Sequence, residues 1–276
     1  MALWWTRLNT LERHRIRETD LLDLKLNSRQ AGVGPSVVLL HGLFASLSSW
    51  LGVSRRLTRY FTIYAVDLRN HGDSFHSTDF NYPVMAEDLK IFLDQQKLNR
   101  AHLVGHSLGG KVAMQFAADF PQRLSRLVVV DMAPRHYPPA LEDIFEAMLS
   151  LDLSQCADRA TAVAALGKRI PCLMTRRFLA KNLVYGGDGR LKWRIALGDI
   201  YTNRHEIYRA VCLDRPVEHR SLFIQGGDSD YILPPDQVLI KNRFPNSRMV
   251  VVGGAGHFVH VDAPGKVSGM VLDFLR

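Results

Sequence analysis

A short glycine-flanked serine segment is the first place where this sequence could do covalent chemistry. Residues 105–109 read Gly-His-Ser-Leu-Gly, the pattern G-x-S-x-G. An apolar run precedes it and an alanine-rich segment with helical character follows, which is the setting that a nucleophile elbow requires. Glycines at both ends allow the tight turn that exposes the Ser107 hydroxyl. The pattern predicts Ser107 as a nucleophile, and the N–H of Leu108 as a donor to a developing oxyanion.

The same segment also fits a phosphate-binding loop. Gly105, Gly110 and Lys111 satisfy G-x-x-x-x-G-K, but the next residue is Val112, which has no hydroxyl to bind Mg²⁺. We therefore favour a serine nucleophile over a nucleotide site.

A serine nucleophile needs a general base. His257 is the predicted base, because it follows the glycine-rich stretch 253–256 and this flexible loop can turn the imidazole toward the serine. His260, three residues later, is predicted to be structural.

Two carboxylates compete to orient this histidine. Asp131 ends the apolar run 127–130, whereas Asp230 lies in the loop after the next core run, 222–224. Only one carboxylate need hydrogen bond to the imidazole, so the other is expected to cap a helix or hold a turn. The positions of Asp131 and Asp230 in the sequence do not decide which of them orients His257.

A second oxyanion donor is expected in the segment His41-Gly42-Leu43-Phe44, directly after the apolar run 37–40. The glycine allows a turn that presents the N–H of Leu43, with Phe44 as the neighbouring candidate. His41 is expected to hold this loop. The residues predicted to line the substrate pocket are Phe44, His106, Trp193 and Ser229.

Alternating strands and helices must position these residues. Short apolar runs such as 37–40, 61–66 and 127–130 are typical of strands buried on both faces, and helical patterns separate them. This alternation predicts an α/β fold with a parallel sheet covered on both sides. The rhythm breaks near Pro134 and returns near residue 216. We therefore predict a core formed by residues 1–134 and 216–276, with a helical cap at 135–215, inserted after the strand that ends near Asp131.

These motifs together resemble the α/β-hydrolase superfamily from about Ser36 onward, and more narrowly the YbfF-type esterases, whose animal mitochondrial relatives are the ABHD-type hydrolases. The resemblance implies an α/β-hydrolase fold with a helical cap and no cofactor or metal. The narrower group places its acid at the position of Asp131, whereas most α/β hydrolases place it at that of Asp230. This sequence carries both, so the acid stays open between them. The supporting segments are 41–46, 67–74, 105–111, 130–134, 188–190, 193–194, 226–229 and 254–257.

The resemblance implies a serine carboxylesterase that hydrolyses short- to medium-chain acyl esters through an acyl-enzyme, with acyl thioesters as further substrates. Alternatives on the same fold are an acyl-CoA thioesterase, a lyase, a C–C hydrolase or a catalytically idle binding protein.

Charge and composition limit the partners of this 276-residue chain. The net charge of +8 is spread along the sequence, and no motif supports nucleic-acid binding. The three cysteines are odd in number and form no C-x-x-C pair, and the sequence shows no secretory signal, so we predict a cytoplasmic protein. The sequence also has no long apolar run, so we predict no membrane span. Arg176, Arg177 and Arg194 could attract an anionic acyl carrier, and Trp4-Trp5 is expected to pack as an N-terminal arm. No pattern specifies an oligomeric state.

Overall fold

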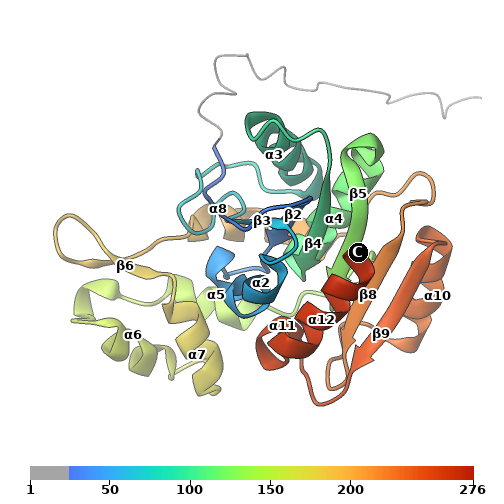
Figure 1. The fold of residues 1–276 in the computed structure, drawn as a ribbon. Helices are drawn as coiled ribbons and strands as arrows, with labels where there is room; N and C mark the ends of the chain where they lie inside the picture. Colours follow the sequence, from blue (N-terminus) through green and yellow to red (C-terminus); the bar gives the residue numbers. More distant parts are fainter. Residues whose placement is uncertain (1–24) are drawn as a thin grey trace, which may run out of the picture.

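The computed structural model describes residues 25–276, so the predicted arm at Trp4-Trp5 lies outside the described residues. A mostly parallel sheet with helices on both faces forms the core (Figure 1). Its strand order is β1-β3-β2-β4-β5-β8-β9, with β1 antiparallel to β3 and the other pairs parallel. The strands are β1 (Ser28–Ala31), β2 (Ser36–Leu40), β3 (Thr62–Val66), β4 (Ala101–His106), β5 (Leu124–Val130), β8 (Ser221–Gly226) and β9 (Ser247–Val252).

The central strands are apolar on both sides because helices cover both faces of the sheet. On β2, Val38 and Leu40 belong to one hydrophobic cluster, whereas Val37 and Leu39 belong to the other. One face packs against η1 (Leu47–Trp50), α2 (Leu51–Leu57), α11 (Val259–Asp262) and α12 (Pro264–Leu275). The other packs against α3 (Tyr82–Gln95), α4 (Leu108–Asp119) and α10 (Pro234–Arg243), and η2 (Pro121–Arg123) follows α4. The predicted alternation of strands and helices is confirmed.

The edge strand β1 was not predicted from the sequence. Its four residues read Ser-Arg-Gln-Ala and are mostly exposed, so they carry no apolar run. Backbone pairing with β3 holds the strand there instead, with Ser28 opposite Val66. A polar edge strand of this kind also discourages pairing with other chains.

Residues 135–215, which we call the cap segment, contain short helices and one small hairpin. The sequence predicted only helices here, because the three-residue strands β6 and β7 are too short to show a pattern. Figure 1 shows α6, α7 and β6 grouped to one side, away from β8 and β9. The elements are α5 (Glu142–Leu149), η3 (Leu153–Gln155), α6 (Arg159–Leu166), α7 (Leu173–Ala180), β6 (Leu183–Tyr185), β7 (Leu191–Trp193), α8 (Leu197–Thr202) and α9 (Arg204–Tyr208). None of the helices described within residues 25–276 is both long and apolar enough to cross a membrane.

Candidate active site

Ser107 occupies a strained turn between β4 and α4. Its backbone has φ 51° and ψ −117°, a conformation that costs a non-glycine residue about 1–3 kcal/mol. The flanking glycines are required by close contacts, since a Cβ on Gly105 would lie 2.2 Å from the Gly109 carbonyl oxygen. A Cβ on Gly109 would lie 2.5 Å from the carbonyl oxygen of Leu40. The strand and helix therefore approach closely enough to hold Ser107 in the sharp turn expected of a nucleophile elbow.

Asp131 and His257 form a hydrogen-bonded pair at the carboxyl edge of the sheet. Asp131 directly follows β5 and is completely buried, and its Oδ2 lies 2.8 Å from His257 Nδ1. Because an ionised carboxylate only accepts hydrogen bonds, Nδ1 of the neutral imidazole carries the proton and Nε2 is left as the basic atom. Gly226 N–H donates to Asp131 Oδ1 at 2.9 Å, and the Ser229 hydroxyl donates to Oδ2. The acid is thus fixed by three donors.

The other candidate acid is placed differently. Asp230 is exposed, and among residues 25–276 the carboxylate within hydrogen-bonding distance of His257 is that of Asp131. Ser229 lies beside Asp230 but turns its hydroxyl onto Asp131, so it supports the acid where the sequence suggested a pocket residue. Of the two carboxylates, the structure brings Asp131 to the histidine.

Aromatic side chains contact the His257 imidazole, among them Tyr231 and His106. Tyr231 stacks on it with ring centroids 3.5 Å apart and an interplanar angle of 14°. The face of an aromatic ring carries negative charge density, which favours a cation placed against it. His106 Nε2 donates to the His257 carbonyl at 2.8 Å, and burial lowers the pKa of His106 far below 6.5. His106 is only 1% exposed, and its bond ties the histidine loop to the elbow at a position where the sequence suggested a pocket residue.

The loop after β2 lies against the elbow, and a Cβ on Gly42 would be 3.3 Å from Ser107 Cβ. Within residues 25–276, the N–H groups of Leu43 and Leu108 have no hydrogen-bond partner, so both remain candidate oxyanion donors. The Phe44 N–H instead donates to His71 Nε2 at 3.2 Å. Leu43 is therefore the candidate donor from this loop, and Phe44 is not.

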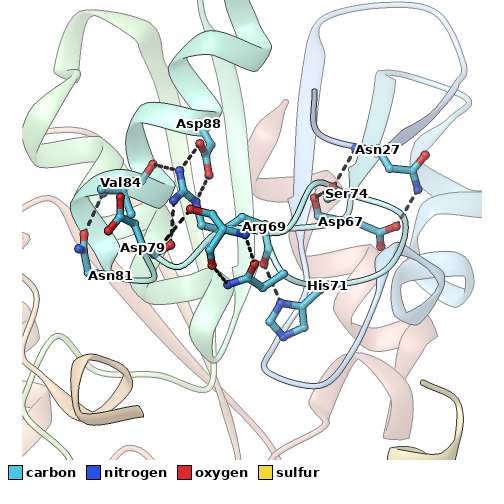
Figure 2. A network of polar contacts seen from close by, with 11 residues as sticks. Asn27, Asp67, Arg69, His71, Ser74, Asp79, Asn81, Val84 and Asp88 are labelled. Atoms are coloured by element: carbon cyan, nitrogen blue, oxygen red, sulfur yellow. Dashed lines mark hydrogen bonds and ion pairs between the residues drawn. The ribbon is translucent and has the colours of Figure 1, made fainter. Parts of the chain in front are cut away.

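A polar network fixes the loop that carries His71 (Figure 2). Arg69 is buried and donates through Nε and an Nη atom to the two oxygens of Asp88 at 2.5 and 2.6 Å. The Arg69 carbonyl accepts from His71 Nδ1 at 2.9 Å, which leaves His71 Nε2 as an acceptor. Burial lowers the pKa of His71 to about 3, so the ring is neutral at physiological pH. Asn27, Asp67 and Ser74 close the other side of the loop.

The two remaining pocket candidates lie against the cap segment. Phe44 is 4% exposed and packs edge-on against Phe145 of α5, with centroids 5.3 Å apart. Trp193 on β7 lines an open hollow of about 630 Å³ together with Asp73, His76 and Arg194. Neither Ser107, Asp131 nor His257 lines that hollow.

Comparison with known proteins agrees with this architecture. The sequence matches the model of the α/β hydrolase fold over residues 35–170. It is 34% identical to the mouse sn-1-specific diacylglycerol lipase ABHD11, over 87% of this chain and 81% of the mouse protein. The chain belongs to the α/β-hydrolase family. It is also 34% identical to esterase YbfF of Escherichia coli strain K12, over 87% of this chain and 92% of that protein. A solved structure described as a marine microorganism esterase superposes with a TM-score of 0.89 at 36% identity, covering 91% of this chain and 99% of that one.

The predicted α/β-hydrolase fold and the resemblance to YbfF- and ABHD-type proteins are thereby confirmed, and the relatives support a hydrolase. Lys111 of this α/β hydrolase is not placed to bind a phosphate. Its Nζ is buried, donates to the Arg209 carbonyl at 2.5 Å and faces the rings of Tyr82 and Tyr137. Burial lowers the pKa of Lys111 to about 7. The side chain joins α4 to the end of the cap segment.

Sequence reasoning missed two residues at this site. Tyr231 stands next to the acid candidate Asp230, but nothing in the sequence shows that its ring covers His257. Asn182 lies in the cap segment and donates to the Phe44 carbonyl at 2.7 Å across 138 residues of sequence. An isolated asparagine gives no signal of such a contact, which only the tertiary structure creates.

Proposed function

We propose that this α/β hydrolase is a serine carboxylesterase that acts on short- to medium-chain acyl esters through an acyl-enzyme. The observation that carries the proposal is the completely buried Asp131, which hydrogen bonds to His257 at 2.8 Å beside the strained turn of Ser107. Related proteins named as an esterase and as a diacylglycerol lipase support ester hydrolysis. Acyl thioesters are the further substrate class.

In the proposed reaction the Ser107 Oγ attacks the ester carbonyl carbon while His257 Nε2 takes its proton. Asp131 stabilises the imidazolium, and the N–H groups of Leu43 and Leu108 bind the oxyanion of the tetrahedral intermediate. His257 then returns the proton to the leaving alcohol oxygen as the ester C–O bond breaks. Water hydrolyses the acyl-serine by the same steps, with His257 again as the base, and releases the carboxylic acid.

A Ser107→Ala variant tests this proposal against p-nitrophenyl esters of increasing acyl length, with acyl-CoA thioesters measured in parallel. We expect the variant to lose essentially all turnover of every substrate that the wild-type protein accepts. Retention of wild-type turnover by Ser107→Ala would overturn the proposal. Turnover of thioesters alone by the wild-type protein would overturn the ester assignment and leave the nucleophile in place.

A further inference from the structure

The turn that carries the Leu43 N–H contains a strained residue. The Ala45 N–H donates to the Gly42 carbonyl at 3.1 Å, which closes a four-residue turn with Leu43 and Phe44 in its centre. Phe44 has φ 57°, a left-handed conformation that costs a non-glycine residue about 1–2 kcal/mol. Such a turn persists only if its surroundings hold it.

Both ends of Phe44 are held by side chains distant in sequence. Its N–H donates to His71 Nε2 at 3.2 Å, and its carbonyl accepts from Asn182 Nδ2 at 2.7 Å. Asn182 is 4% exposed and is itself fixed in the cap segment. The side-chain Nδ2 of Asn182 also donates to the Leu179 carbonyl at 3.2 Å. The backbone carbonyl of Asn182 accepts from the Arg194 N–H at 2.7 Å.

These bonds form a relay through two peptide groups. Asn182 Nδ2 donates to the Phe44 carbonyl, and the N–H of that same peptide group, at Ala45, donates to the Gly42 carbonyl. The Gly42 carbonyl belongs to the peptide group that carries the Leu43 N–H, and in a trans peptide the two point in opposite directions. Each bond in such a chain polarises the next. The orientation and polarity of the Leu43 N–H therefore depend on the amide of Asn182.

One other side chain supports the same peptide group from the core. His41 Nδ1 donates to the Gly42 carbonyl at 2.7 Å, while His41 Nε2 accepts the Leu68 N–H at 3.0 Å. The core thus fixes one end of the relay, and the cap segment fixes the other end through Asn182.

We propose that Asn182 is a positioning residue for the oxyanion hole, so that the cap segment takes part in catalysis as well as covering the core. This inference rests on the proposed function, because it assigns the Leu43 N–H to the oxyanion. If Asn182 has this role, the oxyanion hole is complete only while the cap segment is docked on the loop after β2.

The test compares Asn182→Ala and the equally sized Asn182→Asp with a matched control, Asn203→Ala. Asn203 also lies in the cap segment, and its Nδ2 donates to a core carbonyl, that of Thr78, at the same distance of 2.7 Å. Its partner is not part of the oxyanion loop. Removing one oxyanion donor costs about 10²–10³-fold in kcat, so loss of its positioning should cost about 10-fold or more.

We expect both Asn182 variants to lower kcat for a p-nitrophenyl ester by at least about 10-fold while KM changes by less than about threefold, since the oxyanion bond forms in the transition state. A trifluoromethyl ketone inhibitor should lose affinity in the same proportion as kcat/KM. Asn203→Ala should keep kcat within about twofold of the wild-type value. Equal losses in Asn203→Ala and Asn182→Ala, or an unchanged kcat in the Asn182 variants, would overturn the relay.

Hydrogen exchange of the backbone amides separates this inference from the proposed function. In Asn182→Ala the amide of Ala45 should exchange faster than in the wild-type protein, whereas Asn203→Ala should leave it unchanged. This readout needs no substrate, so it holds or fails even if the protein proves inactive on esters. Unchanged exchange at Ala45 would overturn the relay while leaving the serine esterase proposal intact.

Discussion

Replacing Asp131 by asparagine should reverse the tautomer of His257 at almost constant shape. The carboxylate accepts hydrogen bonds from Gly226, Ser229 and His257, and it is completely buried. If the new amide keeps its oxygen on the Gly226 N–H, its NH₂ group faces His257 Nδ1. The imidazole must then accept there and carry its proton on Nε2, the atom that should take the proton from Ser107.

The magnitude follows from the bonds that the productive tautomer loses. A hydrogen bond to the charged carboxylate is worth about 1.5–3 kcal/mol, and a buried donor left facing another donor costs about 1–3 kcal/mol. Together they raise the barrier by about 2.5–6 kcal/mol, which corresponds to about 10²–10⁴-fold in kcat. Asp230 is exposed, so Asp230→Asn should change kcat by less than about twofold.

The assay is steady-state hydrolysis of a p-nitrophenyl ester by both variants, with thermal unfolding to confirm that each is folded. The account predicts a loss of kcat confined to Asp131→Asn. If Asp131→Asn kept kcat within about tenfold of wild type while Asp230→Asn lost activity, the assignment of the acid would be refuted.

Two further substitutions test the surroundings of His257. Tyr231→Phe keeps the ring stacked at 3.5 Å and should retain kcat, whereas Tyr231→Leu removes about 0.5–2 kcal/mol of cation–π stabilisation and should lower kcat about 2- to 30-fold; equal activity of the two variants would exclude this role. Burial lowers the pKa of His260 to about 3, and within residues 25–276 neither of its ring nitrogens has a hydrogen-bond partner. Between pH 6.5 and about 3, His260 is protonated in the unfolded chain but neutral in the folded protein. Lowering the pH through this range therefore reduces the free energy of unfolding by up to about 1.4 kcal/mol per pH unit. Urea unfolding at pH 7.5 and 5 should show a smaller loss of stability on acidification for His260→Leu than for wild type, and an equal loss would contradict this.

Local sequence patterns were sufficient to predict the strands and helices of the core and the sharp turn at Ser107. One of the helical patterns that separate the apolar runs forms α3, whose first turn is capped by the Asn81 side chain at 3.0 Å from the Val84 N–H. Gly105 is needed for a contact with Gly109 within one strand–turn–helix unit, which short-range spacing can reveal, whereas Gly109 is needed for a contact with Leu40 of β2. Where an element's own residues determine its conformation, the sequence predicts it.

Long-range contacts set the limit of that reasoning. Asp131 and Asp230 both follow core strands, and what separates them is the φ of 53° at Asp131 and its bond to Gly226 N–H, neither of which has a sequence pattern. The basic cap residues show the same limit. Arg194 pairs with the carboxylate of Asp73, whereas Arg176 donates to the neutral carbonyls of Val163 and Pro171 and keeps its positive charge, and no sequence pattern shows this difference.

The nucleophile assignment of Ser107 is tested most directly by labelling with a fluorophosphonate, followed by mass spectrometry of the intact protein and of its peptides. The account predicts one adduct per chain, located on the peptide that contains Ser107, with esterase activity lost in proportion to labelling and no adduct on Ser107→Ala. An adduct on another residue, or full labelling of Ser107 with ester hydrolysis unchanged, would contradict it.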